Sequence, residues 1–313
     1  MKNAICLFLG LVLLCAGFAG CTGGTQRDVV YIAEQFGTAY APIALMREWG
    51  LLEEHLPAGV RVEWSQVGNT AAIREAMLAG KADIGCMAIP PFLIGKDAGM
   101  EWKICSGISN IPMGLVSRDA EVQSLADIGS RRIALPQPGS IQHILLAMAA
   151  ARQLGDATVF DNQLVTMSHP DGMTALLSGA DVDLHFTTAP YLGQELAAGM
   201  TLVLDGTEAM GEPFTGIVAV ASDAFAEENP ALYSAFLAAL QEAITRLNED
   251  PAEAARLLAP VYGMEEDALL AELCAEGTAY TTAVEGVEAF ATFLQQTGYT
   301  GQAWPLEELV AAE

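Results

Sequence analysis

Basic residues are scarce in this chain of 313 residues. Lysine and arginine together number 14, against 39 aspartates and glutamates, so the formal net charge is −25. Because proteins neutralise nucleic-acid phosphates with basic surface, this composition argues against a nucleic-acid partner. Acidity of this kind affects solubility and association, and it does not identify a small ligand.

Cysteine is also scarce, and the motifs of several site classes are missing. The six cysteines and four histidines include no Cys-x-x-Cys or His-x-x-x-His spacing, so we predict no metal site and no cofactor. A Gly-x-Ser-x-Gly elbow and a kinase-type glycine loop are absent too. Cys86 and Cys105 lie in predicted strands, and we expect buried thiols there, with a disulfide between them as the alternative.

The N-terminus has the features of an export signal. An apolar run over residues 4–18 is shorter than the ~20 residues of a membrane span and is followed by small residues. The stretch Phe18-Ala19-Gly20-Cys21 resembles the bacterial lipoprotein signal, although phenylalanine replaces the usual leucine. We therefore expect residues 1–20 to be removed, Cys21 to carry a membrane-anchoring lipid, and residues 21–28 to form a tether. An ordinary signal peptide with an incidental cysteine is the alternative.

Apolar, β-branched runs then alternate with segments of helical periodicity. This alternation is typical of an α/β fold with a mainly parallel sheet covered by helices on both faces. A first series has strands over 29–33, 60–64, 83–87 and 103–107 and helices over 42–54 and 70–79. A second series has strands over 114–116, 132–135, 164–167, 183–186 and 201–204 and helices over 140–154 and 171–178. A strand over 216–221 and four helical patterns follow.

Two stretches of the chain, 69–93 and 168–192, repeat one helix-glycine-strand-proline unit. At this single offset Gly80 matches Gly179, and Pro91-Phe92-Leu93 matches Pro190-Tyr191-Leu192. The match predicts two similar lobes, the alternative being that any α/β protein repeats such units.

Polar or proline-bearing breaks at residues 109–112 and 211–213 suggest where the chain passes between the lobes. We expect lobe 1 to comprise 29–109 and 215–313, including the C-terminal helices, lobe 2 to comprise 113–211, and hinges near 110–112 and 212–214. A cleft would then form where the carboxyl ends of both sheets face each other. The loops predicted there are 36–41, 67–70, 87–92, 137–143, 168–172, 185–191 and 212–215.

These loops contain polar and aromatic residues, and no lysine or arginine; Arg74 and Lys96 are the nearest basic residues. An arginine clamp on a sulfonate or phosphate is therefore not visible. Helix N-termini can still bind a monoanion. The lining slightly favours a neutral planar solute over a sulfonate or nitrate.

The segments at these loops resemble a known family, the nitrate/taurine/sulfonate-type solute-binding proteins of ABC importers, with the thiamine-precursor binders as a branch. The resemblance lies in four segments: GTAYAPIALMREWGLLEEHL (37–56), GNTAAIREAMLAGKADIG (68–85), SLADIGSRRIALPQPGSIQHILL (124–146) and DLHFTTAPY (183–191). It implies a two-lobed type II periplasmic binding protein fold with two hinge crossovers, closure over a small solute, and delivery to a membrane permease. We expect the protein to be a monomer.

Ligand contacts follow from the resemblance position by position. In lobe 1 they are Phe36, Thr38, Tyr40, Asn69, Thr70, Ala88 and Pro90. In lobe 2 they are Ser140, Gln142, His143, Pro170, Asp171, Thr187 and Pro190, and we add Thr188 and Phe214 from the same loops.

Several of these residues have a second interpretation. Asn69 and Ser140 stand where helix caps are needed, and Asp171 completes a Ser168-x-x-Asp171 capping box. Tyr40 can be a core or interface aromatic. The histidines at 143, 169 and 185 lie on separate elements without a clear carboxylate or cysteine partner, which favours solvent-facing or hydrogen-bonded histidines over metal ligands.

Two function classes remain open. A non-catalytic solute receptor is favoured, and an exported enzyme that uses serine, histidine and aspartate from the same loops is the alternative. The missing catalytic motifs and the export signal favour the receptor.

Overall fold

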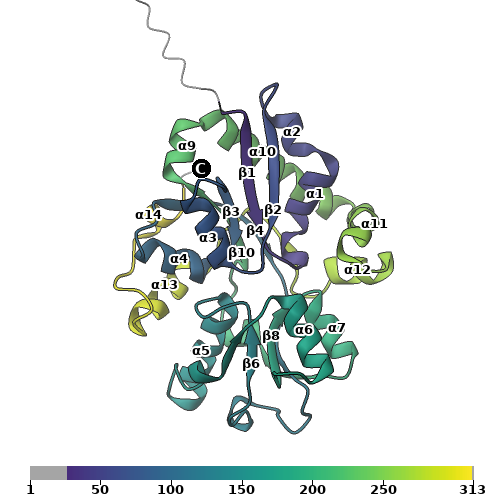
Figure 1. Cartoon of the computed structure of the whole chain (residues 1–313), viewed down its shortest axis with the longest axis vertical. Helices are drawn as coiled ribbons and strands as arrows, with labels where there is room; N and C mark the ends of the chain where they lie inside the picture. Colours follow the sequence, from purple (N-terminus) through teal and green to yellow (C-terminus); the bar gives the residue numbers. More distant parts are fainter. Residues whose placement is uncertain (1–26, 312–313) are drawn as a thin grey trace, which may run out of the picture.

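A computed structural model describes residues 27–311 of the chain. It consists of two α/β lobes, one above the other, each built around its own sheet (Figure 1). The predicted signal segment 1–20 and Cys21 lie outside the described residues, as does most of the predicted tether. Within residues 27–311, no helix combines the length and apolarity that a membrane crossing requires.

Lobe 1 contains a six-stranded sheet with the order β11-β4-β10-β3-β1-β2. Its strands are β1 (Val29–Glu34), β2 (Arg61–Gln66), β3 (Ile84–Met87), β4 (Trp102–Asn110), β10 (Ile217–Ser222) and β11 (Ala279–Tyr280). Lobe 2 contains a five-stranded sheet with the order β7-β6-β8-β5-β9. Its strands are β5 (Met113–Ser117), β6 (Ile133–Leu135), β7 (Leu164–Thr166), β8 (Leu184–Thr188) and β9 (Thr201–Asp205).

The sheets are mixed, which corrects the expectation of a mainly parallel arrangement. Strands β1, β2 and β3 pair in parallel, as do β6, β7 and β8, but β10 and β5 are antiparallel to both of their neighbours. The reason lies in the crossings between lobes. Strands that carry loops to the cleft run toward the other lobe, whereas β5 and β10 begin just after a crossing and so run away from it.

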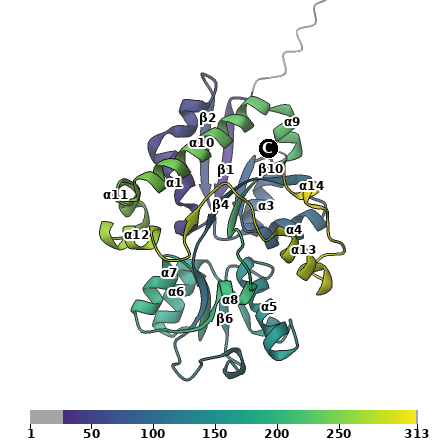
Figure 2. The same ribbon diagram turned by 180° about the vertical axis from the view of Figure 1, so that it is seen from behind.

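The chain passes between the lobes twice. It leaves lobe 1 after β4, which ends at Asn110, and returns between α8 and β10, at residues 211–216. The helices after β10 all belong to lobe 1. Among them α10 packs on α1, α2 and β4, and α13 packs on α4. Figure 2 shows α10 crossing the back of this lobe. The predicted fold class, a two-lobed type II fold with two crossovers and C-terminal helices on the first lobe, is confirmed.

The helices largely follow the predicted periodicities. Lobe 1 has α1 (Ala41–Trp49), α2 (Leu51–His55), α3 (Thr70–Leu78), α4 (Ile89–Asp97), α9 (Asp223–Glu228), α10 (Pro230–Glu249), α11 (Pro251–Tyr262), α12 (Glu266–Leu273), α13 (Val287–Gln296), α14 (Leu306–Leu309) and the short η1 (Thr38–Tyr40). Lobe 2 has α5 (Ile141–Leu154), α6 (His169–Ser178), α7 (Tyr191–Ala197), α8 (Gly206–Met210), η2 (Leu125–Asp127) and η3 (Asp161–Gln163).

Two predicted helical stretches are divided in the structure. The segment 42–54 is split because Gly50 adopts a left-handed conformation with a φ of 67°, which ends α1. The four C-terminal helical patterns become six helices in the described part of the chain, α9 to α14.

The repeated unit forms the same structure in both lobes. Residues 69–93 give α3, β3 and the start of α4, and residues 168–192 give α6, β8 and the start of α7. Both middle strands also occupy equivalent places, because β3 lies between parallel β1 and antiparallel β10, and β8 lies between parallel β6 and antiparallel β5.

The hydrophobic core fills both lobes and continues across the crease between them. Trp102, Phe92 and Phe236 are fully buried in lobe 1, and Phe186 is fully buried in lobe 2. These four belong to one connected cluster of buried side chains. A smaller cluster lies in lobe 2.

Candidate functional site

A cavity opens between the lobes, where loops that follow the parallel strands meet. It encloses ≈ 480 Å³ of space unfilled by protein atoms, part of it open to solvent. We call it the inner cavity. Its lining consists of Gln35, Phe36, Ala39, Tyr40, Thr70, Ala88, Pro91, Ile111, Met113, Pro136, Ser140, Ile141, Gln142, His169, Thr188 and Ile217.

The lobe 1 wall begins where β1 ends. Gly37 turns the chain with a φ of 121°, and a Cβ atom there would come within 3.1 Å of the Ala189 carbonyl oxygen of lobe 2. This close approach requires glycine. Burial raises the pKa of Tyr40 well above its usual range, so its hydroxyl stays neutral. From α3, Thr70 presents its hydroxyl, which accepts a hydrogen bond from the Gln35 side-chain amide at 3.1 Å.

The lobe 2 wall carries a chain of polar contacts. The Gln142 amide nitrogen lies 3.4 Å from Nε2 of His169, and Nδ1 of His169 lies 3.2 Å from Oγ1 of Thr187. The His169 ring also stacks on Tyr191, with ring centres 5.9 Å apart. Burial, and secondarily His185, lowers the pKa of His169 to about 3. A neutral ring accepts from Gln142 and donates to Thr187, so it can hold Gln142 in place at the cavity.

Behind His169 lies a fully buried pair, His185 and Glu195. Nδ1 of His185 is 2.6 Å from Oε1 of Glu195, and neither side chain has any exposed surface. Burial raises the pKa of Glu195 to about 8 and lowers the pKa of His185 to about 3. Both directions describe an uncharged pair, in which the protonated Glu195 carboxyl donates to His185. The His169 and His185 ring centres lie 5.7 Å apart, so the pair forms the base of the polar wall.

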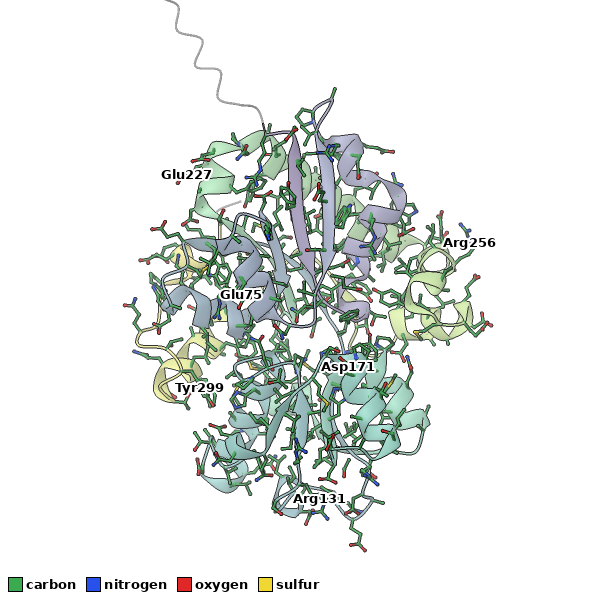
Figure 3. The ribbon with its side chains drawn as sticks, in the orientation of Figure 1. Glu75, Arg131, Asp171, Glu227, Arg256 and Tyr299 are labelled. Atoms are coloured by element: carbon green, nitrogen blue, oxygen red, sulfur yellow. The ribbon has the colours of Figure 1, made fainter. Side chains whose placement is uncertain are left out.

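The lobes contact each other around the cavity. The backbone N–H of Thr38 donates to the Ala189 carbonyl at 3.2 Å. On another side, the backbone N–H of Ala71 donates to the side-chain oxygen of Gln137 at 2.9 Å. A third contact joins the Tyr299 hydroxyl of lobe 1 to Nε2 of His143 at 3.4 Å. Figure 3 shows Tyr299 on the C-terminal segment beside the crease.

Seven residues predicted as ligand contacts line the inner cavity: Phe36, Tyr40, Thr70, Ala88, Ser140, Gln142 and Thr188. Asn69 lines a neighbouring cavity instead, and its side chain caps α3 by accepting from Ala72 N–H. Ser140 both lines the inner cavity and caps α5. Ser140 can therefore cap α5 and still be available to a solute in the cavity.

The other predicted contacts do not line the inner cavity. Thr38, Pro90 and Thr187 are buried beside it, and Pro190 follows a cis peptide bond at the start of α7. Pro170 lies in the first turn of α6.

For three of them the structure shows other partners. His143 accepts from Gly139 N–H at 2.9 Å through Nδ1 and contacts Asp161 at 3.0 Å through Nε2. Ser168 Oγ accepts from Asp171 N–H, which is the N-cap half of the predicted capping box, and the Asp171 carboxylate accepts from the Ser168 hydroxyl at 2.5 Å. Phe214 packs edge-on against Phe290.

Sequence reasoning missed about half of the lining. The sequence predicts His169 only as a solvent-facing or hydrogen-bonded histidine. Its contact with Gln142 depends on α5 and α6, which meet only in the folded lobe. Ile111, Met113 and Ile217 lie at the two crossings. No chemical signal distinguishes these apolar residues from ordinary core residues.

Metal-ligand geometry is not found in residues 27–311, where no group of three or more histidine, cysteine, aspartate or glutamate side chains converges. Cys86 and Cys105 are free thiols.

Comparison with solved structures identifies similar folds. The periplasmic aliphatic sulphonate binding protein SsuA of Escherichia coli matches at 22% identity over 91% of this chain and 92% of that chain, with a TM-score of 0.69. The alkanesulfonate-binding protein SsuA of Xanthomonas axonopodis pv. citri, bound to MOPS, matches at 22% identity over 88% and 94%, with a TM-score of 0.73. The ligand-binding component of an ABC-type import system of Staphylococcus aureus, with zinc bound, matches at 15% identity over 91% and 96%, with a TM-score of 0.71.

At these identities the likeness shows the fold alone. A search of the curated proteins finds no match. A family model described as NMT1/THI5 like matches residues 55–254, which include the whole of lobe 2 and both crossings. The chain therefore belongs to the NMT1/THI5-like family.

Proposed function

We propose that this protein is a lipid-anchored solute receptor, which captures a small molecule in the inner cavity and delivers it to an ABC importer. The observation that carries this proposal is the composition of the cavity wall. Residues of both lobes contribute, and the cavity lies at the carboxyl ends of β1, β3 and β6, where open α/β sheets bind their ligands.

The lining also supports a role in binding over a role in catalysis. Ser140 Oγ already accepts a hydrogen bond from His143 N–H, and the His143 ring is directed to Asp161. His169 has a pKa near 3, far below the range in which a histidine works as a general base at neutral pH. A serine with an adjacent base is therefore not assembled at this wall.

The proposal includes motion of the lobes. We propose that 29–109 with 215–313 and 113–211 move as two bodies about hinges near 110–112 and 212–214. A solute enclosed by both walls can enter only if the lobes separate, which would break the three hydrogen bonds across the crease described above and part of the apolar packing there.

The experiment is a thermal-shift screen of small solutes on the soluble chain starting at Thr25, followed by titration of the hits. A receptor gains stability with solute concentration. Replacement of Gln142 by alanine should weaken binding by about five- to a hundredfold, because a neutral hydrogen bond left unmade costs ~1–3 kcal/mol. Gln296→Ala is the matched control, since Gln296 is exposed on α13. Chemical change of a bound solute at a rate that Gln142 controls would favour the enzyme instead.

Membrane anchoring is tested separately. Cys21→Ser should release the protein from the membrane fraction, while Cys274→Ser, at an exposed free thiol of lobe 1, should leave it there. Retention of the Cys21→Ser variant in the membrane would contradict the lipid anchor and leave the receptor proposal standing.

A further inference from the structure

A second cavity adjoins the inner one on the side of α3. It has ≈ 740 Å³ of space unfilled by protein atoms, part of it open to solvent, and we call it the outer cavity. Its lining consists of Asn69, Thr70, Ala71, Arg74, Pro91, Ile94, Gln137, Pro138, Gly139 and Thr166. Thr70 and Pro91 line both cavities, so the two spaces meet at these residues.

Among the described residues that line the two cavities, Arg74 alone carries a charge, because burial keeps His169 neutral. No acidic group of residues 27–311 lies within ion-pair distance of Arg74, whereas most other arginines of this acidic chain do have such a partner. The adjacent Glu75 is exposed, and across the crease Asp171 is hydrogen-bonded to Ser168 (Figure 3). The positive charge of Arg74 is thus left uncompensated beside an open space.

Two backbone donors at the start of α3 are already engaged. Ala71 N–H donates to Gln137 and Ala72 N–H donates to Asn69. Arg74 follows Thr70 by four residues, which places both on the helix face that borders the cavities. A guanidinium group offers several donors in a planar fork that suits carboxylate, sulfonate and phosphate.

The inner cavity has the opposite character. Its tyrosine and histidine are neutral, and its remaining lining is apolar or amide and hydroxyl. An ionised group without a counter-charge would lose its hydration there at a high cost. The same group placed in the outer cavity keeps contact with water and gains a cation.

We propose that the solute has two parts: an uncharged body that occupies the inner cavity and an anionic group, a carboxylate, sulfonate or phosphate, that lies in the outer cavity against Arg74. This inference rests on the proposed receptor function. Under this proposal Arg74, which lies outside the predicted loops, is the residue that selects solutes with a negative charge.

The test uses matched pairs of probes that differ in one group. Suitable pairs are benzoate and benzamide, benzenesulfonate and benzenesulfonamide, phenyl phosphate and phenol, and MOPS and 3-morpholinopropan-1-ol. Each is titrated by calorimetry and thermal shift against the wild type, Arg74→Gln and Arg74→Lys. Arg256→Gln, on α11 at the far side of lobe 1, removes the same charge away from both cavities (Figure 3).

We expect at least one anionic member to bind about tenfold or more tightly than its neutral partner. Arg74→Gln should lower the affinity for that anionic probe by about 10- to 100-fold, and Arg74→Lys should lower it by less. Arg256→Gln should leave the affinity unchanged. The proposal is overturned if neutral members bind as tightly, if Arg74→Gln leaves the anionic preference intact, or if no anionic member binds. Neutral probes that bind and lose affinity in Gln142→Ala would leave the receptor function in place and exclude only the role of Arg74.

Discussion

The two copies of the repeated unit share a backbone and differ in what they bury. In lobe 1, α3, β3 and α4 surround apolar residues such as Ile73 and Ile84. At three other positions of the unit, lobe 2 carries buried polar residues. His169 matches Thr70 at the start of the helix, and by strand register and helix position His185 matches Gly85 and Glu195 matches Gly95. Lobe 1 therefore adds Gln35, Tyr40 and Thr70 to an otherwise apolar or aromatic wall, and lobe 2 adds polar residues backed by a buried histidine network.

Buried polar residues make lobe 2 more sensitive to mutation, because a buried donor or acceptor is stable only when it has a hydrogen-bond partner. Gly95 lies against the Trp102 ring and carries no polar side chain, whereas Glu195 is fully buried against His185. Lobe 2 thus depends on one specific partner for its buried acid. The two copies of the unit have the same fold, but we expect them to respond differently to mutation and to pH.

The largest effect should come from breaking the buried pair. His185→Ala should lower the free energy of unfolding by about 3 kcal/mol, because it leaves Glu195 buried without a partner and also creates a cavity. Cys86→Ala, at a buried position of the equivalent strand β3 in lobe 1, should cost about 1 kcal/mol because no polar partner is orphaned. Urea unfolding followed by circular dichroism measures both. Equal losses would contradict the contrast between the lobes.

The pH dependence of stability should follow from the same pair. The pKa of Glu195 rises from 4.5 to about 8 on folding, so between these values the folded protein holds a proton that the unfolded chain has lost. Stability should therefore decline as the pH rises through this window. The pKa values of His169 and His185 fall from 6.5 to about 3, so their effect is the reverse, a rise in stability from pH 3 to 6.5.

Between pH 6.5 and 8 only the Glu195 effect remains from this group. We expect the melting temperature to fall by a few degrees across that interval in the wild type. Glu195→Gln, which cannot ionise, should flatten this part of the profile. If the melting temperature of Glu195→Gln fell by the same amount, the pH dependence would come from other titratable groups. The two lobes would then not differ in their response to pH through Glu195.

Solute binding should also be unequal between the lobes. His169→Ala should weaken the binding of any hit from the screen by roughly ten- to a hundredfold, since it removes the support of Gln142 and a cavity wall. Thr70→Ala should weaken it by about fivefold or less, because the Gln35 amide that contacts the Thr70 hydroxyl is free to turn to the solute. Calorimetric titration of both variants gives the two dissociation constants. A greater loss of affinity in Thr70→Ala would mean that lobe 1, and not lobe 2, supplies the more important hydrogen bonds to the solute.

The smallest effect is expected at the crease. Gln137→Ala removes the side-chain acceptor of Ala71 N–H and should shift the unliganded protein toward more open forms without changing the fold. Small-angle scattering should show a slightly larger radius of gyration in the variant, and addition of solute should reduce it in both proteins. An unchanged radius in wild type with and without solute would argue for a rigid site.

Much of the fold could be predicted from local patterns. The repeated unit, the alternation of strands and helices, and the caps at Asn69, Ser140 and Ser168 each depend on residues close together in the chain. The directions of β5 and β10 could not be predicted in this way, since they depend on where the chain crosses between lobes. Periodicity is the same for parallel and antiparallel strands.

The residues of the candidate site were harder to predict from the sequence than the fold. Tyr40, Thr70 and Gln142, which line the inner cavity, are predicted because the family resemblance places ligand contacts at these positions. Arg74 was excluded from the predicted loops because it lies one turn inside α3, although that turn faces an interlobe cavity.

The sequence by itself determined the elements, the two-lobed organisation and the acidic charge, because these follow from spacing and composition. Only the tertiary structure decided which polar groups meet. His169 reaches Gln142, and His185 reaches Glu195, through contacts between different elements whose relative placement no local pattern encodes. Their neutral state is likewise a tertiary property, since it arises from burial by the surrounding lobe.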